Sequence, residues 1–428
     1  MNIVDRIRYK NWLHEKTTKQ LFKNVLSLAI LQGFNYVLPL ITIPYLIRIL
    51  GAGYFGLISF ANATIAYFII ITDYGFNLTA TREIAIHRTN HNKICEIFSA
   101  VIIIKTVLMV CSFIILVLLI TFIDKFSSHA NVYIFTFGTV LGQVFFPLWF
   151  FQGMEQMKYI TYLNVLSRLF FTVAIFIFVK DKADYVFVPA LSSSGYILSG
   201  LISLIIVQRI FHIQFYWQTC QTLRTYLKDS WYIFVIDFMP NLYNNFSTFL
   251  LGFTAPLETV GYYTLATKIT GIFNNLIYVI RNATYPYLSK NSEYFSVILQ
   301  ITLIAGVFFT LAILYLSNTV FEFLFGKVIQ NSLLYIYILS LSPFLMAISV
   351  SFGSNRLLIL KKDREMKNIT IYFSVFGFCL AIILIPVYGA AGAAVTVVLA
   401  RCLMAFLTYR SSIKVNTRLT HPIKLHSA

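Results

Sequence analysis

Long apolar runs recur along the whole chain, and they constrain its fold more than any other feature. A helix that crosses a bilayer takes about 20 apolar residues, and the sequence holds about 12 such windows. With 58% hydrophobic residues, 11% charged residues and a mean hydropathy of +0.77, the chain lacks the polar surface that a soluble protein of 428 residues needs. We therefore predict an all-α polytopic membrane protein. The predicted spans are Val25–Ile47, Phe55–Thr72, Val101–Ile123, Val132–Phe151, Ile160–Val179, Tyr185–Val207, Trp231–Phe253, Val260–Tyr278, Phe295–Leu316, Leu333–Leu358, Ile369–Val387 and Gly389–Tyr409.

Basic residues are distributed between these windows in a pattern that predicts the orientation of the chain. With the N-terminus in the cytoplasm, about 22 of the Lys and Arg residues fall on that side and roughly 5 fall outside, as the positive-inside rule expects. Both termini are therefore predicted to be cytoplasmic. The net charge of +17 then reflects topology, and no nucleic-acid partner is predicted. The basic segment Met1–Lys23 has no apolar core or cleavage site, so it is interpreted as a cytoplasmic lead rather than a signal peptide.

The longest internal connection, Gln208–Asp229, divides the predicted spans six and six. Weak internal sequence similarity at an offset of 205 residues matches Gly56 with Gly261 and Asn77 with Asn282. Halves of six spans each start on the same side of the membrane, so they are predicted to be parallel, pseudo-symmetric repeats about an axis along the membrane normal. The predicted domains are residues 1–23 (basic cytoplasmic N-terminus), 24–208 (N-terminal six-helix bundle), 209–229 (cytoplasmic linker), 230–410 (C-terminal six-helix bundle) and 411–428 (cytoplasmic tail).

Motifs of catalysis and metal binding are missing from the sequence. It contains no GxxxxGK[ST] loop, no HExxH and no GxSxG. The five cysteines are scattered singly with no CxxC spacing, and the histidines are isolated in or near loops. No catalytic residue, metal site or cofactor is therefore predicted.

Three basic residues lie deep inside predicted spans. A charge at the bilayer centre costs at least roughly 2.5–3.5 kcal/mol, so such groups usually face a bundle interior or a wet cavity. Arg168, Lys268 and Arg401 lie roughly 12–20 Å into their helices, too deep to reach the headgroups easily. Two interpretations stay open for each residue: it lines a central cavity, or it belongs to a buried structural pair.

Three further basic residues, Lys105, Arg281 and Arg356, lie toward the cytoplasmic ends of their helices. Long basic side chains at such depths can reach the headgroups by snorkelling. We favour this interpretation for Lys105 and Arg356.

Asp237 is the main acid inside a span, in the segment IFVIDFMPNLYNNF. Pro240 interrupts the helix ladder beside it, and Asn241 and Asn244 follow at helical spacing. One interpretation is a proton or cation site, or a face that binds sugars. The alternative is a salt bridge from Asp237 to Lys268 or Arg401.

The apolar run Leu57–Ile71 continues without a break into a polar cluster that contains Asp73, Arg82 and Glu83. The predicted topology places this cluster at the cytoplasmic mouth. We therefore interpret Asp73, Arg82 and Glu83 as an inner gate, with Asp73 expected to pair with Arg82 as the bundles close.

Four segments carry a resemblance to a known family. They are FGLISFANATIAYFIIITDYGFNLTATREIA (55–85), PLWFFQGMEQMKYIT (147–161), YYTLATKITGIFNNLIYVIRNATYPYLSK (262–290) and GAAGAAVTVVLAR (389–401). The chain resembles the Wzx-type O-antigen flippases, which belong to the polysaccharide transporter family of the multidrug/oligosaccharidyl-lipid/polysaccharide exporter superfamily. The first segment is fairly specific, and the glycine-rich last one is weak alone.

The resemblance implies a V-shaped pair of six-helix bundles around a central cavity, in the inner (cytoplasmic) membrane. It implies alternating-access transport of an oligosaccharide on undecaprenyl pyrophosphate from the inner to the outer leaflet, for O-antigen or a related surface polysaccharide. Polysaccharide polymerase and chain-length proteins are the expected partners, besides the bilayer. Because the pyrophosphate is anionic, Arg168, Lys268, Arg401 and Arg281 are expected to bind it. An ion gradient of H⁺ or Na⁺ is expected to drive an antiport cycle, with Asp237 as the coupling site and Asn241 and Asn244 beside it.

Two other functions compete with this one. A membrane glycan polymerase or glycosyltransferase would carry a large outer loop or an acidic motif, whereas the outer loops near Asp124–Asn131 and Ser317–Asn331 are short. A multidrug or small-cation exporter of the same superfamily would have an acid-rich cavity, whereas Arg and Lys predominate at mid-membrane.

Overall fold

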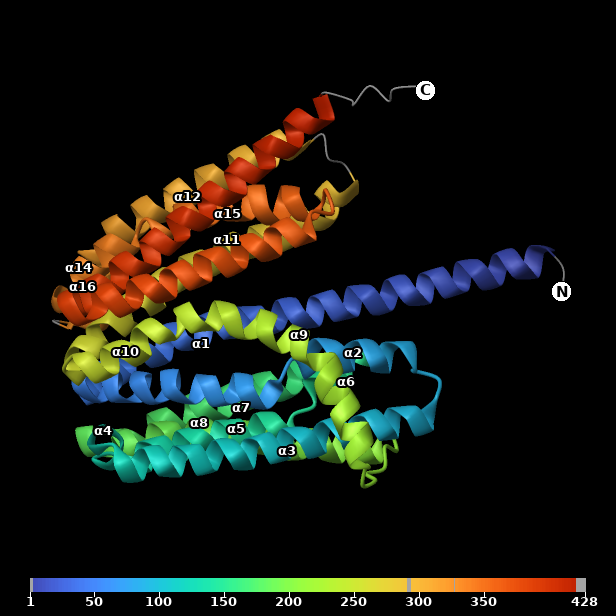
Figure 1. The fold of residues 1–428 in the computed structure, drawn as a ribbon, viewed down its shortest axis with the longest axis horizontal. Helices are drawn as coiled ribbons and strands as arrows, with labels where there is room; N and C mark the ends of the chain where they lie inside the picture. Colours follow the sequence, from blue (N-terminus) through green and yellow to red (C-terminus); the bar gives the residue numbers. More distant parts are fainter. Residues whose placement is uncertain (1–2, 291–293, 327, 421–428) are drawn as a thin grey trace. The chain divides into compact units, whose positions relative to one another are not determined.

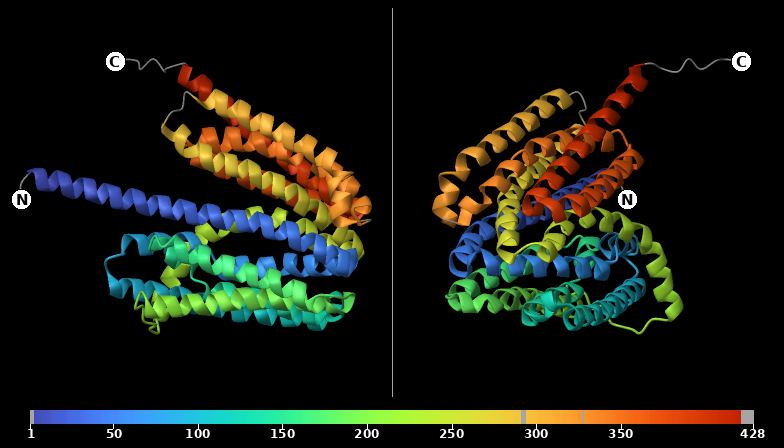
Figure 2. Two further views of the ribbon diagram at one scale, coloured as in Figure 1. Left: turned by 180° about the vertical axis from the view of Figure 1, so that it is seen from behind. Right: turned by 60° about the vertical axis from the view of Figure 1, so that its left-hand side comes forward.

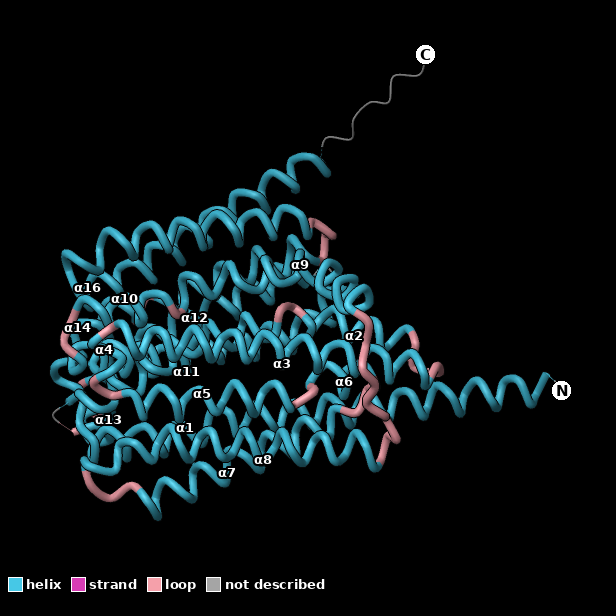
Figure 3. Tube along the Cα trace, turned by 60° about the horizontal axis from the view of Figure 1, so that its bottom comes forward, coloured by secondary structure: helices cyan, strands magenta, loops and turns pink. Residues whose placement is uncertain are grey.

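The structure, a computed structural model, is built from helices joined by short loops, with no strand among the residues that it describes (Figure 3). It describes residues 3–290, 294–326 and 328–420. The side chains of some helical residues fall outside this description, namely 3–32, 34–37, 236–237, 240–244, 286–287, 289–290 and 415–420.

The helices pack as two compact units. Unit 1 comprises the residues up to Ile49 together with Ile65–Asp237, and unit 2 comprises Leu50–Thr64 together with the residues from Phe238 onward. The domain boundaries expected from the sequence stay a prediction. The first helix, α1 (Ile3–Asp73), contributes to both units.

Unit 1 is a bundle in which α5 packs on α8, α7 on α8 and α3 on α5 (Figure 1). A short helix, α6, packs on α2 in the same unit. Besides α1, its elements are α2 (Phe76–Ile86), α3 (His91–Phe122), α4 (Asp124–Ser127), α5 (Ala130–Phe145), α6 (Leu148–Gly153), α7 (Met157–Phe178), the 3-10 helix η1 (Lys182–Val186), α8 (Phe187–Arg209) and the first part of α9 (Cys220–Asn244).

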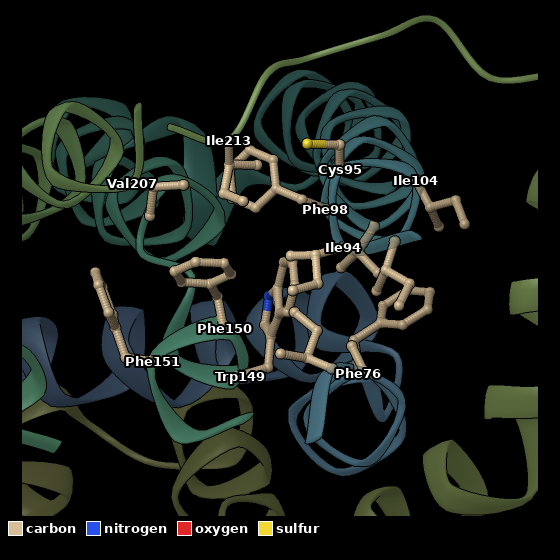
Figure 4. Close-up of a cluster of buried hydrophobic side chains, with 14 of the residues drawn as sticks. Phe76, Ile94, Cys95, Phe98, Ile104, Trp149, Phe150, Phe151, Val207 and Ile213 are labelled. Atoms are coloured by element: carbon tan, nitrogen blue, oxygen red, sulfur yellow. The ribbon is translucent and has the colours of Figure 1, made fainter. Parts of the chain in front are cut away.

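An aromatic cluster forms the core of unit 1 around α6 (Figure 4). Trp149, Phe150 and Phe151 are consecutive and fully buried. Successive helix residues point about 100° apart, so three consecutive buried residues require neighbours around more than half of this helix. The ring of Phe98 on α3 lies 5.7 Å from that of Trp149, and Phe76 on α2 joins the cluster. The core thereby fixes α2, the helix that carries the predicted gate residues Arg82 and Glu83.

Unit 2 is a second bundle, in which α12 packs on α15, α11 on α14, and α16 on α10 and α15. A π-helix, η3, interrupts its helical pattern and packs against α11 and α16. Its elements are the end of α9, α10 (Phe246–Thr254), α11 (Leu257–Lys290), α12 (Phe295–Ser317), α13 (Val320–Phe325), α14 (Val328–Leu339), α15 (Ser342–Ser349), η3 (Val350–Leu358) and α16 (Asp363–Thr420).

Every predicted span is mostly helical in the described part of the chain, which confirms the all-α polytopic prediction. The span Val132–Phe151 is broken between α5 and α6, and the span Leu333–Leu358 is broken between α14 and α15. By length and composition, 8 helical stretches of this part could cross a membrane. Two of them, Leu38–Ile86 and Asp363–Lys414, have 49 and 52 residues. The first contains the end of one predicted span and the whole of the next, and the second contains two predicted spans. The predicted spans Trp231–Phe253 and Val260–Tyr278, on α9–α10 and α11, fall outside these stretches, and their sequences contain Asp237 and Lys268.

Glycines interrupt the two longest helices. The backbone of α1 leaves helical geometry at Gly51 (φ 75°), and that of α16 does so at Gly389 (φ 55°). Glycine adopts positive φ without a Cβ penalty, so a sharp break is inexpensive there. Beyond Gly389 the chain turns back, because Phe373 packs against Ala400 within the same helix α16 (Figure 2). In the sequence these glycines flank the first and the last predicted hairpin, which predicts tight turns there, and the structure confirms this.

A close helix contact in unit 2 depends on two more glycines. A Cβ at Gly56 would lie 1.8 Å from the Leu257 carbonyl oxygen, and one at Gly261 would lie 2.1 Å from the Ala52 carbonyl oxygen. The segment Leu50–Thr64 therefore packs backbone to backbone on α11, as small residues allow in membrane helices. The predicted repeat matches Gly56 with Gly261, and the two lie at one contact; the repeat itself stays a prediction.

Gly56→Ala is expected to destabilise the protein, because its methyl group would overlap a carbonyl oxygen and force the helices apart. Overpacking of this kind costs about 1–3 kcal/mol or more. Gly271→Ala on α11 is the matched control, since nothing lies within 4 Å of its Cβ position, and it should be neutral or stabilising by up to about 1 kcal/mol. Thermal unfolding in detergent measures both changes. Equal unfolding temperatures for the two variants would contradict the contact.

Candidate functional site

The four candidate cations are divided between the units. Arg168 lies on α7 in unit 1, whereas Lys268 and Arg281 lie on α11 and Arg401 lies on α16, all in unit 2. Lys268 is exposed, and the other three are partly buried. Ion pairs in the described part of the chain involve other basic side chains, so no described carboxylate neutralises these four.

Arg401 is held by a neutral hydrogen-bond chain across three helices of unit 2. Its Nη1 donates to the Ser342 hydroxyl on α15, and that hydroxyl donates to Asn274 Oδ1 on α11 at 3.2 Å. Ser342 is 1% exposed and Asn274 is 6% exposed. A guanidinium has five N–H donors, and the hydrogen bond to Ser342 uses one of them. The chain thus positions the guanidinium while leaving its charge uncompensated by any described acid.

A second polar group of unit 2 lies between α11 and the π-helix η3. Asn355 on η3 donates to the Thr284 hydroxyl at 3.4 Å, and Thr284 in turn hydrogen-bonds within α11 to the Arg281 carbonyl at 3.3 Å. The Arg281 Nε and Asn355 Oδ1 atoms are buried without a partner among the described residues. π-Helices occur frequently at functional sites. This group thus contains unsatisfied hydrogen-bonding atoms on Asn355 and on Arg281. Arg281 is the second partly buried arginine of unit 2 that no described acid neutralises.

Lys105 does not snorkel, and this sequence prediction was wrong. Its side chain is 2% exposed, and its Nζ lies 2.7 Å from Asp73 Oδ1. The carboxylate partner in the fold removes the need to reach the headgroups. The other residue predicted to snorkel, Arg356, is partly buried with its guanidinium 4.7 Å from the centre of the Phe295 ring, and its snorkelling stays a prediction.

Asp73 and Arg82, expected to pair as an inner gate, have different partners in the structure. Asp73 accepts from Lys105, whereas Arg82 Nε lies 3.5 Å from its neighbour Glu83, with 65% of the Arg82 side chain exposed. A break in the helix separates the two residues, because Tyr74 and Gly75 both have positive φ between α1 and α2.

Arg82 and Glu83 line a pocket of about 400 Å³ between α2 and the start of α3 and α9 in unit 1. Within it, the Tyr226 hydroxyl donates to Glu96 at 3.2 Å, and Lys93 lies 2.7 Å from the same carboxylate. Burial, and then the Glu96 charge, raise the pKa of Tyr226 above its usual value. Tyr226 therefore remains a neutral donor at physiological pH.

Three predicted polar residues, Asp237, Asn241 and Asn244, lie on α9 with their side chains outside the described residues. Their roles as a coupling site or a salt bridge stay predictions. Asn274, Ser342 and Asn355 were not predicted. Each is a polar residue inside an apolar span and could have been noticed for that reason. The sequence alone does not show which basic residue such a side chain contacts. No group of three or more His, Cys, Asp or Glu suited to a metal ion occurs among the described residues.

Comparison with known proteins relates this chain to polysaccharide biosynthesis proteins and to proteins named as O-antigen transporters. Residues 21–292 match the family model described as polysaccharide biosynthesis protein. A protein of Escherichia coli (strain K12) named "Putative O-antigen transporter" is 33% identical over 394 residues, 90% of this chain and 95% of that protein. A protein of the same name from Shigella dysenteriae is 26% identical over 91% of this chain and 99% of its own length.

Solved structures share the fold at low sequence identity. The lipid II flippase MurJ in an inward closed conformation superposes with a TM-score of 0.70 at 14% identity, over 91% of this chain and 87% of that one. An inward-facing multidrug resistance MATE family transporter gives 0.67 at 16% identity, over 94% and 100%. The fold is therefore that of membrane transporters, and the relatives are named as transporters rather than enzymes.

Ser342→Ala is expected to destabilise unit 2, because Asn274 loses its donor and Arg401 loses its acceptor in a buried setting. The expected cost is about 1–3 kcal/mol, that of leaving a buried polar group unpaired. Ser349→Ala is the matched control on the same helix, since its buried hydroxyl donates to the Leu345 carbonyl of its own helix at 2.9 Å and has no other partner among the described residues. Thermal unfolding of both variants checks this, and a larger loss for Ser349→Ala would refute the bridging role of Ser342.

Proposed function

We propose that this chain, which belongs to the polysaccharide biosynthesis protein family, moves a lipid-linked oligosaccharide between the leaflets of a membrane. Membership in the family, the transporter fold and the names of the relatives support this function. The proposed substrate is an O-antigen repeat unit or a related surface glycan on undecaprenyl pyrophosphate.

The uncompensated cations of unit 2 are the observation that carries the proposal. Arg401 and Arg281 are partly buried in an apolar helical unit, and no described acid neutralises them. A cation in such a setting attracts an anion strongly, since the effective dielectric constant is low there. A pyrophosphate offers the several anionic oxygens that a guanidinium recognises with charge-assisted hydrogen bonds. Lys268, and Arg168 in unit 1, are the further proposed contacts.

The proposed transport is by alternating access, from the cytoplasmic to the outer leaflet of the inner membrane, with both termini in the cytoplasm. The polyprenyl tail would stay in the hydrocarbon while the charged headgroup passes through the protein. The distribution of basic residues between the spans supports this orientation. An ion gradient is the proposed source of energy, and polysaccharide polymerase and chain-length proteins are the proposed partners.

A multidrug or small-cation exporter is the second candidate, because the MATE transporters share the fold. At 16% identity this likeness speaks for the fold alone. A cationic drug would be repelled by Arg281 and Arg401, and this repulsion favours the anionic substrate.

The test uses purified protein in vesicles with undecaprenyl pyrophosphate that bears a fluorescent monosaccharide. A membrane-impermeant reductant quenches only the probe in the outer leaflet. The protein should raise the fraction of probe that becomes accessible over time above that of empty vesicles. An accessible fraction equal to that of empty vesicles would overturn the proposed function.

Arg401→Ala is expected to slow this movement about 10–100-fold, because a charged hydrogen bond contributes about 1.5–3 kcal/mol. Arg364→Ala, which removes an exposed arginine from the same helix α16, should leave the rate unchanged. Unfolding temperatures confirm that both variants are folded. An unchanged rate for folded Arg401→Ala would remove Arg401 from the binding site.

A further inference from the structure

A cavity of about 200 Å³ lies inside unit 1, among residues of α1, α2, α3, α5, α7 and α8. We call it the amide pocket, because the side-chain amides of Asn77, Gln143 and Asn164 line it. At about 30 Å³ per water molecule, its volume corresponds to about six or seven waters. It lies below the range of about 300–1,000 Å³ that is usual for drug-sized ligands. The space therefore suits a ligand about as large as one monosaccharide.

The charges that line the amide pocket cancel each other. Lys105 Nζ donates to Asp73 Oδ1 at 2.7 Å, and Asn77 Nδ2 donates to Asp73 Oδ2 at 3.0 Å. The remaining lining side chains are amides, hydroxyls and apolar groups. A net charge of zero gives the pocket no electrostatic preference for an anion such as pyrophosphate or for a cation. The pocket therefore favours a neutral polar ligand.

Several hydrogen-bonding atoms in the amide pocket are available to a ligand. The Gln143 amide and the Tyr196 hydroxyl have no hydrogen-bond partner among the described residues. Asn77 donates to Asp73, and Asn164 donates to a carbonyl of its own helix at 2.8 Å, so the Oδ1 atoms of both asparagines can still accept. An amide supplies both donors and acceptors, and each hydroxyl group of a sugar can also donate and accept. The available atoms therefore match a sugar.

Two aromatic side chains, Phe146 and Tyr196, also line the amide pocket. An aromatic ring offers a flat apolar surface, and a sugar ring has an apolar C–H face that can pack on it. Both side chains are partly buried, and the Asp73 side chain keeps 26% of its surface exposed. The pocket is therefore open to solvent rather than enclosed.

We infer that the amide pocket binds a sugar unit of the lipid-linked glycan and thereby contributes to the choice of substrate. This inference rests on the proposed function. It assigns the sugar to unit 1, whereas the proposed contacts of the pyrophosphate lie mainly in unit 2. A site whose polar atoms hydrogen-bond a hydroxyl group rejects a ligand that lacks it, because those atoms are then left unpaired.

The wild-type protein gives the first test, by its affinity in detergent for five lipids. One is undecaprenyl pyrophosphate capped by a methyl group, and the others carry a monosaccharide or a trisaccharide of glucose or of N-acetylglucosamine. The cap keeps the charge of the pyrophosphate equal in all five, so a difference in affinity reports the sugar. At least one sugar-bearing lipid should bind about tenfold more tightly than the capped lipid, the effect of about two neutral hydrogen bonds.

The double variant Gln143→Leu/Asn164→Leu removes two amides at nearly constant volume. It should fold, because neither amide bonds another helix among the described residues. Its affinity for the preferred sugar-bearing lipid should fall about tenfold, to that for the capped lipid, which should bind as it does to the wild type. Gln208→Leu, at an exposed position near the end of α8, is the matched control and should keep the wild-type preference.

Tyr196→Phe provides an independent readout. It removes one hydroxyl group and keeps the ring, so the preference for the sugar-bearing lipid should fall about threefold and not vanish. A Tyr196 with a purely structural role would change the unfolding temperature but leave the ratio of the two affinities unchanged.

Three results would overturn the inference: equal wild-type affinities for all five lipids, a sugar preference retained by the folded double variant, or an unchanged ratio in Tyr196→Phe. Equal affinities together with movement of the fluorescent probe in vesicles would overturn this inference alone. Absence of any probe movement in the wild type would instead overturn the proposed function.

Discussion

Removing basic side chains from water inside apolar helices costs free energy, and the polar contacts inside both units offset this cost. In unit 1 the response is neutralisation, since Lys105 lies against Asp73 at 2.7 Å. In unit 2 the response is support by hydrogen bonds, with no neutralising acid among the described residues, since Arg401 donates to Ser342, which donates to Asn274. The first arrangement cancels the charge within the unit, and the second suits attraction of an anionic ligand. The same desolvation cost is therefore met by an ion pair in unit 1 and by neutral hydrogen bonds in unit 2.

Helix packing makes these arrangements possible. The aromatic cluster around α6 fixes α2 in unit 1, next to the helix break that follows Asp73. In unit 2, α11 supplies Asn274 to the Arg401 chain and Thr284 to Asn355, and it also accepts the close contact at Gly56 and Gly261. A single helix therefore links backbone packing with both polar groups of its unit.

The sequence predicted the spans, the turns at Gly51 and Gly389 and the family, because apolar length, glycine geometry and local motifs are all local properties. It did not predict the pairing of Lys105, because its depth along α3 says nothing about a carboxylate on α1. For the same reason the support of Arg401 by Ser342 was missed. The relation of Asp237 to the cations stays a prediction, since its side chain lies outside the described residues.

The central claim is that uncompensated cations bind the pyrophosphate of a lipid-linked glycan. The most direct measurement compares the affinity of the purified protein for two lipids with the same sugar and polyprenyl chain, one joined by pyrophosphate and the other by a neutral ether. The account predicts much tighter binding of the pyrophosphate lipid, with an advantage that falls when Arg401 is replaced by alanine. Equal affinities for the two lipids would contradict it.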